Sequence, residues 1–368
     1  MSKKIRILQV TGSLRMGGLE NVAMNIFRYA DKDKYEFDFL VYGDKEEFFE
    51  REVRELGGRV YHISYPHNNP VKYMREMRQI MKEHGPYDVV HSHSLFNSGF
   101  VMAAAKKENI KIRIAHGHSD RRKIKQSFFR ESYNNFMRYL INKYVTKRFA
   151  CSSGAAMYLY GEKYSSDCYI VNNGVDVKKF VFNVEERNKI RDELNLNGCK
   201  VVGHVGRLVN VKNQEKIIDV FSYAYKQDRS LRLVIAGDGE LKVQLQSKID
   251  SLGLHNVANL IGIRSDVSSL LSAFDVYMMP SFYEGVSVSL IEAQASGVPC
   301  LVSSQAASLE TRLTECINML DVNDSVELWG DNLLSLVNAE RMICASEAII
   351  EKGYNIPDIA CKVLKWYH

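Results

Sequence analysis

Short apolar runs alternate with amphipathic stretches along the chain. In the first half these runs predict strands at Ile5–Val10, Phe37–Tyr42, Arg59–Ile63, Asp88–His91, Ile112–His116, Phe149–Cys151 and Tyr169–Val171. Apolar residues at helical spacing between the runs predict helices, for example at Leu19–Ala30 and Val71–His84. Strands that alternate with helices are typical of a parallel sheet built from βα units.

The same series starts again in the second half. Strands are predicted at Val201–Val205, Leu231–Ala236, Val257–Ile261, Val276–Met279 and Cys300–Val302, with helices at Gln214–Lys226, Leu241–Leu252 and Val288–Ser296. The restart predicts an α/β protein with two doubly wound, Rossmann-like domains, 1–172 and 173–352. The Asn173-Gly174 turn marks the hinge, and 353–368 is expected to form a helix that crosses back onto the first domain. Ligands of such sheets bind at the carboxyl ends of the strands, so a site is expected in a cleft between the domains.

The first candidate motif directly follows the first strand, at Thr11–Glu20. Gly17 and Gly18 stand where the next helix begins. Glycines let the backbone approach a phosphate, and a helix N-terminus offers free N–H groups. The alternative is an ordinary tight turn between strand and helix. The spacing is neither GxGxxG nor a Walker loop, which disfavours a dehydrogenase or an NTPase.

Two further motifs follow strands of the second half. Arg207 and Lys212 lie in the loop after Val201–Val205, where two cations can neutralise a diphosphate, although they could also be solvated surface charges. Glu284 and Glu292 stand eight residues apart, with Ser287 as the expected N-cap of the helix that contains Glu292. A carboxylate can accept hydrogen bonds from two sugar hydroxyls, and the alternative is a pair of exposed acids.

These motifs together resemble glycosyltransferase family 4, a large family of retaining enzymes with the GT-B fold. The resemblance rests on Gly17–Glu20, Gly206–Leu208 with Lys212 and Asn213, Ala236–Gly239, Glu284 with Glu292, and Ala293–Pro299, in that order. It covers about residues 5 to 305. The segment from Ser303 to Trp329 is similar to the branch that builds bacterial capsular and extracellular polysaccharides.

The resemblance implies a role for each matching residue. Arg207 and Lys212 would hold the diphosphate, Glu292 the ribose and Glu284 the transferred sugar. The implied donor-binding set is Gly17, Gly18, Arg207, Lys212, Glu284, Gly285, Val286, Val288, Ser289 and Glu292. The implied catalytic set is His116, Arg207, Lys212 and Glu284, with His118 as the alternative to His116 near the reacting carbon. His93, Asn97 and His118 are expected to line the acceptor side.

Two His-x-His pairs, His91 with His93 and His116 with His118, are also compatible with a metal site. No cysteine or carboxylate accompanies them, and the seven cysteines of the chain form no CxxC pair. The family resemblance implies that no metal is needed. We therefore expect no cofactor and no metal, with a nucleotide diphosphate sugar, in the first instance a UDP-sugar, as substrate.

Charge is divided unevenly between the two halves. Residues 1–172 contain 29 Lys/Arg and 19 Asp/Glu, whereas 173–368 contain 20 and 25. Residues 121–148 hold nine of the basic residues together with six aromatic residues and one acid, Glu131. Such a basic amphipathic stretch suits an anionic membrane surface, and the alternative is that the aromatic residues pack inward. No nucleic-acid recognition motif accompanies the charges.

The resemblance thus implies a retaining, metal-independent hexosyltransferase that acts on a glycan or lipid-linked acceptor in bacterial surface polysaccharide synthesis. The unpaired cysteines fit a reducing cytoplasm, and the basic stretch 121–148 predicts a peripheral position on the inner face of the plasma membrane. No apolar run is long enough to predict a helix that spans a bilayer. The alternatives are a nucleotide-sugar epimerase or hydrolase of the same fold, and a protein that binds a nucleotide sugar without catalysis.

Overall fold

The computed structural model describes residues 3–15, 17–120, 122, 126–284, 286–307 and 311–368. The chain divides into two compact units. Unit 1 comprises Met1–Asn173 together with Ile356–His368, and unit 2 comprises Gly174–Asn355. The predicted boundaries fall after residues 172 and 352. The last segment of the chain thus belongs to the same unit as the first.

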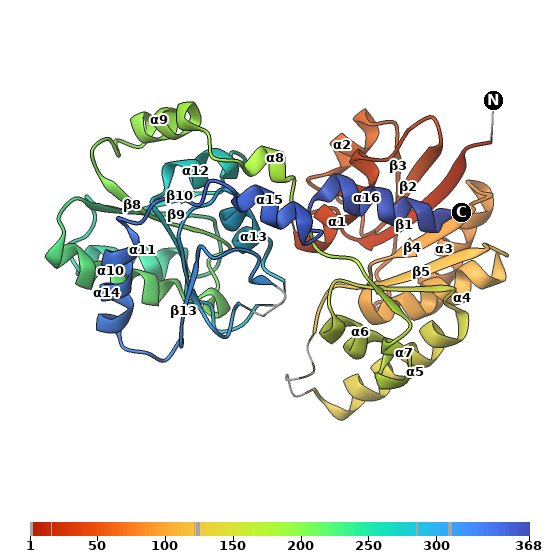
Figure 1. Cartoon of the computed structure of the whole chain (residues 1–368). Helices are drawn as coiled ribbons and strands as arrows, with labels where there is room; N and C mark the ends of the chain where they lie inside the picture. Colours follow the sequence, from red (N-terminus) through yellow and green to blue (C-terminus); the bar gives the residue numbers. More distant parts are fainter. Residues whose placement is uncertain (1–2, 16, 121, 123–125, 285, 308–310) are drawn as a thin grey trace. The chain divides into compact units, whose positions relative to one another are not determined.

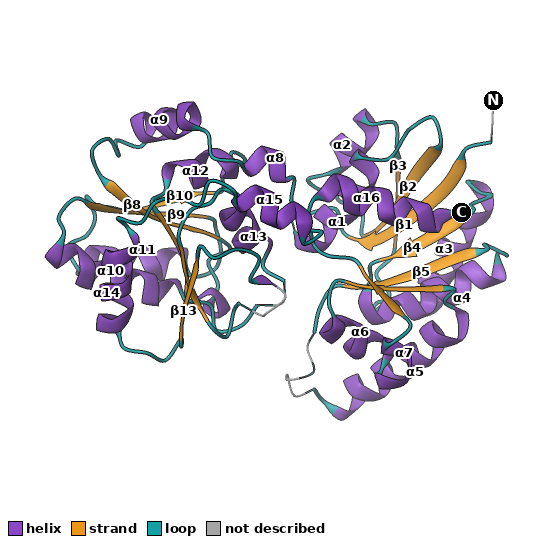
Figure 2. Cartoon of the chain, viewed as in Figure 1, coloured by secondary structure: helices purple, strands orange, loops and turns teal. Residues whose placement is uncertain are grey.

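Unit 1 is a seven-stranded parallel sheet with helices on both faces (Figures 1 and 2). The strand order is β3-β2-β1-β4-β5-β6-β7. Its strands are β1 (Ile5–Gly12), β2 (Tyr35–Tyr42), β3 (Arg59–Ile63), β4 (Val89–Ser92), β5 (Ile112–Gly117), β6 (Lys147–Ala150) and β7 (Cys168–Ile170). Its helices are α1 (Gly18–Arg28), α2 (Glu50–Glu55), α3 (Pro70–Glu83), η1 (Leu95–Asn97), α4 (Ser98–Lys107), α5 (Phe128–Tyr144), α6 (Ser153–Tyr160), α7 (Glu162–Ser165), α16 (Ile356–Leu364) and η4 (Lys365–Tyr367).

The C-terminal helix α16 packs on the sheet of unit 1 beside α1. Its apolar face, with Ile359, Val363 and Leu364, joins the core formed by β1, β2 and α1. Tyr367 in η4 is also buried in this core. Apolar residues at helical spacing give α16 one buried stripe, which is why a segment so far along the chain completes this sheet.

Unit 2 is a six-stranded parallel sheet in the order β10-β9-β8-β11-β12-β13. Its strands are β8 (Lys200–Val205), β9 (Leu231–Ala236), β10 (Ala258–Gly262), β11 (Val276–Met279), β12 (Cys300–Ser303) and β13 (Ile317–Leu320). Its helices are α8 (Val177–Phe180), α9 (Val184–Glu193), η2 (Asn210–Lys212), α10 (Gln214–Gln227), α11 (Lys242–Ser251), α12 (Val267–Ala273), α13 (Val288–Ala295), α14 (Val326–Leu336) and α15 (Ala345–Glu351).

Each face of this second sheet has its own apolar core. One core joins α8, α9, α12, α13 and α15 to the strands, and the other joins α10, α11 and α14 to them. The prediction of two doubly wound α/β units is confirmed. Strand β13 was not predicted, because its two middle residues, Asn318 and Met319, are exposed and its pattern is too short to read. None of the described helices is long and apolar enough to cross a bilayer.

Candidate functional site

The loops after β8 and β9 pack tightly against each other in unit 2. The backbone N–H of Gly206 donates to Ala236 O at 3.0 Å, and that of Leu208 donates to Asp238 O at 3.0 Å. A Cβ at Gly237 would overlap the carbonyl oxygen of Gly206, and its φ of +147° also favours glycine. The first turn after each strand is therefore held close to its neighbour. Arg207 and Lys212 project from this packed edge.

A third loop, after β11, brings Glu284 beside Lys212. Asn213 donates its side-chain N–H to Pro280 O at 3.1 Å, and the N–H of Phe282 donates to Val211 O at 2.9 Å. These bonds join the two loops. The Lys212 ammonium and the Glu284 carboxylate lie 2.6 Å apart, with side chains only 14% and 12% exposed. The structure thus brings together two of the predicted catalytic residues, as a nearly buried ion pair.

Arg207 differs from Lys212 in its surroundings. Its side chain is exposed and forms no ion pair with any residue in the described part of the chain. Its backbone carbonyl accepts a hydrogen bond of 2.7 Å from Gln214, which fixes the turn. A guanidinium held on a fixed turn and free of an acid can bind an incoming anion without first breaking a contact.

Helix α13 begins at Val288, and Ser287 is its N-cap residue as predicted. The Ser287 side chain does not cap the helix. Its hydroxyl contacts Ser289, which also accepts a hydrogen bond of 3.1 Å from Tyr277. The first N–H groups of α13 have no partner within the helix and are available to an anion. Val286 packs against the core, and Gly285 lies outside the described residues.

Glu292 lies on α13, one turn inside the helix, and its side chain is half-buried. Burial raises the pKa of its carboxyl to about 8, and the nearby Lys179 offsets this only in part. Near neutral pH most copies therefore carry a proton when no ligand is bound. A cation or a pair of hydroxyl donors would stabilise the charged form.

In unit 1 the predicted glycine loop meets α1. Gly17 is the N-cap residue, and Glu20 in the first turn lies so close that a Cβ at Gly17 would collide with its carboxylate. That carboxylate also accepts a hydrogen bond from Ser13. Gly18 faces open space. An acid at a helix N-terminus already satisfies the positive end of the helix dipole, so this end of α1 suits hydroxyl groups better than phosphate.

Four histidines gather at the carboxyl ends of β4 and β5. His91 and His116 are fully buried, His93 is 1% exposed, and only His118 retains part of its surface. The rings of His116 and His118 lie 4.0 Å apart between centroids, and those of His91 and His93 lie 4.2 Å apart. Burial lowers the pKa of each imidazole, to about 3 for His91 and His118 and well below the ordinary value for the other two. All four are neutral at physiological pH.

His116 and His118 differ in exposure. The sequence analysis favoured His116 over His118 as the residue near the reacting carbon. His116 lies wholly under other side chains, and a group that touches substrate needs an accessible surface. The partly exposed His118 at the end of β5 fits that requirement better. Asn97, another of the three predicted acceptor-side residues, accepts a 2.6 Å hydrogen bond from Tyr133.

Nitrogens of His91, His93 and His116 lie within 4.8 Å of one another, the spacing of a metal site. Both nitrogens of His91 and both of His93 are already engaged in hydrogen bonds. A metal would have to break these bonds, because a ligating imidazole needs a free lone pair. The arrangement therefore suits a hydrogen-bonded cluster better than metal ligation.

Two members of this cluster were missed by the sequence analysis. Gln9 lies in β1 and Tyr367 near the C-terminus, and both are buried against the histidines. Gln9 is the one polar residue in the run Ile7–Val10, a signal that could have been used. Nothing in the local sequence of Tyr367 indicates a partner 276 residues away.

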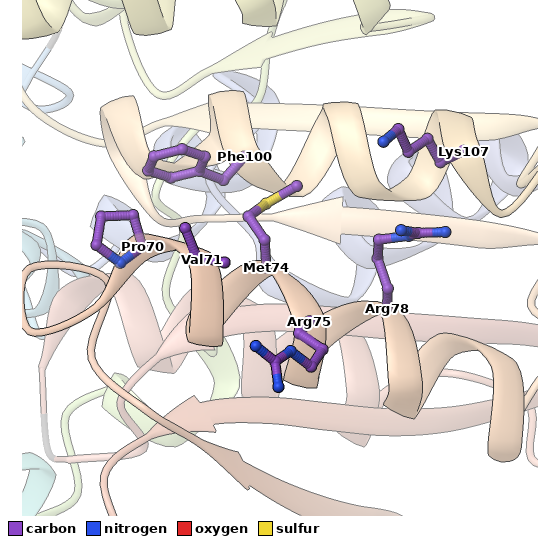
Figure 3. A pocket seen from close by; sticks show the side chains of 7 residues that line it. All are labelled: Pro70, Val71, Met74, Arg75, Arg78, Phe100 and Lys107. Atoms are coloured by element: carbon purple, nitrogen blue, oxygen red, sulfur yellow. The ribbon is translucent and has the colours of Figure 1, made fainter.

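A hollow of about 470 Å³ lies elsewhere on unit 1, along α3 and α4 (Figure 3). Its walls combine apolar with cationic side chains, namely Pro70, Val71, Met74, Arg75, Arg78, Phe100 and Lys107. Arg78 is held by Glu108 at 2.6 Å. None of the predicted site residues lines this hollow, so it is separate from the histidine cluster.

Two family models match the chain. The model described as Glycosyltransferase Family 4 matches residues 16–179, and the model described as Glycosyl transferases group 1 matches residues 186–321. Together they cover nearly all of both sheets and every predicted site residue.

Similar proteins extend over the whole chain. EpsF of Bacillus subtilis (strain 168), which is named as a glycosyltransferase, is 28% identical over 373 residues, covering 100% of this chain and 97% of EpsF. A second relative is the UDP-Gal:alpha-D-GlcNAc-diphosphoundecaprenol alpha-1,3-galactosyltransferase of Escherichia coli. It is 24% identical, and the alignment covers 99% of this chain and 97% of that enzyme. The crystal structure of Anabaena Alr3699/HepE with UDP shares the fold, with a TM-score of 0.81, 19% identity, and coverage of 98% and 99%.

Proposed function

The chain belongs to glycosyltransferase family 4, and from this premise we propose that it transfers a hexose from a UDP-sugar to a glycan or lipid-linked acceptor. We further propose that transfer retains the anomeric configuration, needs no metal or other cofactor, and serves bacterial surface polysaccharide synthesis. Relatives named for a UDP-galactose donor, a diphosphoundecaprenol-linked acceptor and capsular polysaccharide biosynthesis support the assigned donor, acceptor and pathway.

The observation that carries the proposal is the group of charges at the sheet edge of unit 2. Arg207, Lys212 and the first N–H groups of α13 supply positive charge where strands β8 and β11 end. Breaking the bond between the sugar and the diphosphate builds negative charge on the leaving group, and fixed cations lower that barrier. Glu284, held beside Lys212, is assigned to the sugar, and Glu292 to the ribose hydroxyls.

In unit 1 we assign contacts with sugar and acceptor hydroxyls to His118, and to Gly17 and Gly18 at the start of α1. These groups suit hydroxyls because His118 is neutral and Glu20 supplies an acceptor next to Gly17. His116 supports His118 from below, since the two rings are in contact. The acceptor side thus offers a neutral imidazole and a carboxylate, both of which can accept hydrogen bonds from hydroxyl groups.

The first test is transfer itself, in excess EDTA. Thermal-shift screening over UDP-, GDP-, ADP- and TDP-sugars identifies the donor, because a ligand that binds the folded state raises the melting temperature. We then expect full transfer to a lipid-linked acceptor in EDTA, with little free sugar. Release of free sugar at the same rate without acceptor would indicate a hydrolase, epimerised donor would indicate an epimerase, and loss of activity in EDTA would contradict the metal-free assignment.

UDP should bind more tightly as pH rises from 6.5 to 8.5. The ribose diol needs the charged form of Glu292, and the pKa of its carboxyl is about 8 before UDP binds. Binding below pH 8 must therefore release a proton, so affinity should increase on the order of tenfold over this range. Titration calorimetry measures the change. The Glu292→Gln variant serves as control and should show a flat, weaker profile, and an equally steep profile would remove Glu292 from the nucleotide site.

Helix α5 supports the proposed contact with an anionic membrane. Phe128, Phe129, Phe136 and Tyr139 are 78%, 85%, 55% and 57% exposed. Helical spacing places them on one face, with Lys143. The interpretation in which these aromatic side chains pack inward is therefore wrong for these four. Arg121 and Lys123–Lys125 of the predicted basic stretch lie outside the described residues.

We expect the full chain to co-sediment with vesicles that contain anionic phospholipid at low salt. Replacing Phe128, Phe129 and Phe136 with serine should weaken partitioning at least ~10-fold, since burying even part of three aromatic side chains contributes more than 1.4 kcal/mol. A matched control replaces the exposed Val243 and Ile263 of unit 2 with serine. Equal binding of both variants, or no binding by the wild type, would contradict membrane docking through α5.

A further inference from the structure

The histidine cluster of unit 1 is organised by a glutamine side chain into two hydrogen-bonded chains. Gln9 Nε2 lies 3.1 Å from the hydroxyl of Tyr367, and Gln9 Oε1 lies 2.9 Å from Nε2 of His93. One chain therefore starts at Tyr367 and the other at His93. Both starting points are buried, and so is Gln9.

The first chain runs from the Tyr367 hydroxyl to His91 Nδ1 at 2.8 Å, and from His91 Nε2 to His116 Nδ1 at 3.2 Å. The second chain runs from His93 Nδ1 to His118 Nε2 at 2.8 Å. Each chain ends on an atom that is out of contact with solvent. These end atoms, His116 Nε2 and His118 Nδ1, have no hydrogen-bond partner among the residues that the structure describes.

The chemistry of the Gln9 amide determines the protons of the second chain. An amide oxygen only accepts, so His93 must carry its hydrogen on Nε2. A neutral imidazole has one N–H, so His93 Nδ1 accepts, and the hydrogen in its bond with His118 comes from His118 Nε2. His118 is left with a lone pair on Nδ1.

The amide nitrogen of Gln9 orders the first chain in the same way. It only donates, so the Tyr367 oxygen accepts from it and directs its own O–H to His91 Nδ1. His91 then donates from Nε2 to His116 Nδ1. His116 is left with an N–H on Nε2.

We propose that Gln9 and Tyr367 are positioning residues that hold all four histidines in the Nε2–H tautomer. His118 then offers a hydrogen-bond acceptor and His116 a hydrogen-bond donor, at rings that are in contact. A ligand hydroxyl group would donate to His118, whose ring retains part of its surface, while His116 stays buried beneath it. The tautomer assignment stands on geometry alone, and the identity of the ligand as a sugar or acceptor hydroxyl rests on the proposed function.

The charge state of the cluster supports this ordering. Burial lowers the pKa of all four imidazoles, so at neutral pH each ring carries only one N–H. Each ring therefore has one donor nitrogen and one acceptor nitrogen. Burial also raises the pKa of Tyr367, so its hydroxyl keeps the hydrogen that it donates. A buried polar atom left unpaired at the end of a hydrogen-bonded chain is destabilising, so a hydroxyl group bound at His118 Nδ1 would be favourable.

The opposite orientation of the Gln9 amide gives a second arrangement of the hydrogen atoms. If the Gln9 amide were turned by half a rotation, its nitrogen would face His93 and its oxygen would face Tyr367. Every hydrogen bond in both chains would reverse, and all four imidazoles would carry their hydrogen on Nδ1. The cluster thus has two self-consistent proton arrangements, which a nitrogen spectrum distinguishes.

The experiment is long-range ¹H–¹⁵N correlation NMR of the full chain labelled with ¹⁵N-histidine. Signals of the four residues are assigned by their loss in the single variants His91→Asn, His93→Asn, His116→Asn and His118→Asn. We expect an N–H type Nε2 and a lone-pair type Nδ1 for all four in the wild type at pH 7.5. Finding Nδ1–H on His93 and His118 would overturn the proposal. This test is made on the wild type, and the variants are needed only to assign the signals.

Two variants separate the chains. Gln9→Met should disturb the tautomers of all four histidines, because Gln9 orders both chains, whereas Tyr367→Phe should disturb those of His91 and His116 while His93 and His118 keep theirs. Tyr35→Phe is the matched control, because it removes a buried hydroxyl that contacts Leu364 and His368 in the same C-terminal segment but lies outside the cluster. It should leave all four tautomers unchanged, and equal effects of Tyr367→Phe and Tyr35→Phe would contradict the assignment.

Activity gives a separate readout. Gln9→Met should lower kcat for transfer about tenfold, with little change in the KM for the donor, since it mispositions a contact group without removing it. Unchanged kcat in Gln9→Met despite disturbed tautomers would overturn the positioning role. If the wild type shows the expected tautomers but transfers no sugar, the proposed function fails while the proton ordering stands.

Discussion

Replacing Lys212 with alanine should lower kcat/KM for sugar transfer at least ~30-fold, and replacing Arg207 with alanine should do the same. Each cation is expected to contribute at least ~2 kcal/mol to the transition state, the size found for one preorganised oxyanion donor. Steady-state kinetics, with the donor identified by thermal shift, measures kcat/KM for both variants. Near-normal turnover of both variants would contradict the assignment of the sheet edge of unit 2 to the diphosphate.

The ion pair with Glu284 requires a control, because removing Lys212 leaves a nearly buried carboxylate without its partner. Loss of activity could then reflect local destabilisation. The double variant Lys212→Ala with Glu284→Gln removes both charges. If Lys212 acts on the diphosphate, the double variant regains stability but not activity.

A surface lysine provides the second control. Lys226 lies exposed in the last turn of α10, at the far end of the helix that follows Lys212. Lys226→Ala changes the net charge by the same amount and should leave kcat/KM within twofold of the wild type, since exposed surface substitutions have small effects. A loss as large as that of Lys212→Ala would indicate a general charge effect.

Unit 1 should be far more sensitive to acid than unit 2. Burial lowers the pKa of His91, His93, His116 and His118, so the unfolded chain binds protons that the folded unit does not. The stability that these neutral imidazoles contribute is fully present above the unfolded pKa of about 6.5 and is lost as pH falls toward about 3. When the pH falls from 7.5 to 5.5, each buried imidazole lowers the free energy of unfolding by about 1.4 kcal/mol, so the four together lower it by about 5 kcal/mol.

Unit 2 is the internal control for this prediction. Among its described residues one histidine, His204, has a lowered pKa, to about 4, because it is buried. Glu292, whose pKa is raised to about 8, takes up a proton in the folded unit over the same pH range and opposes this loss, so unit 2 should lose little or no stability. The chain has two tryptophans, Trp329 buried in unit 2 and Trp366 in unit 1, so single Trp→Phe variants let fluorescence follow each unit separately. Urea unfolding at pH 7.5 and 5.5 then gives the change in the free energy of unfolding of each unit. Equal losses in both units would contradict the claim that the four histidines are neutral in the folded state.

Local pattern determined most of the fold. Runs such as Ile5–Val10 and Leu231–Ala236 are apolar throughout because a central parallel strand is buried on both faces, and the segments between them have helical spacing. The placement of polar residues at strand ends followed from the same pattern, since parallel strands share one carboxyl edge. This pattern places Lys212, Glu284, His93 and His118 near strand ends, and the family resemblance implied their roles.

Contacts between distant residues were decided only by the tertiary structure. The pairing of Lys212 with Glu284, the burial of His116 beneath His118, and the hydrogen bonds of Gln9 and Tyr367 to the histidines depend on how separate segments pack. Periodicity reports which face of an element is buried but not which partner lies against it. The sequence by itself therefore determined two α/β units with charged and polar residues at their strand ends. Packing decided which of these residues touch, because the contacts join residues up to 358 positions apart in the chain.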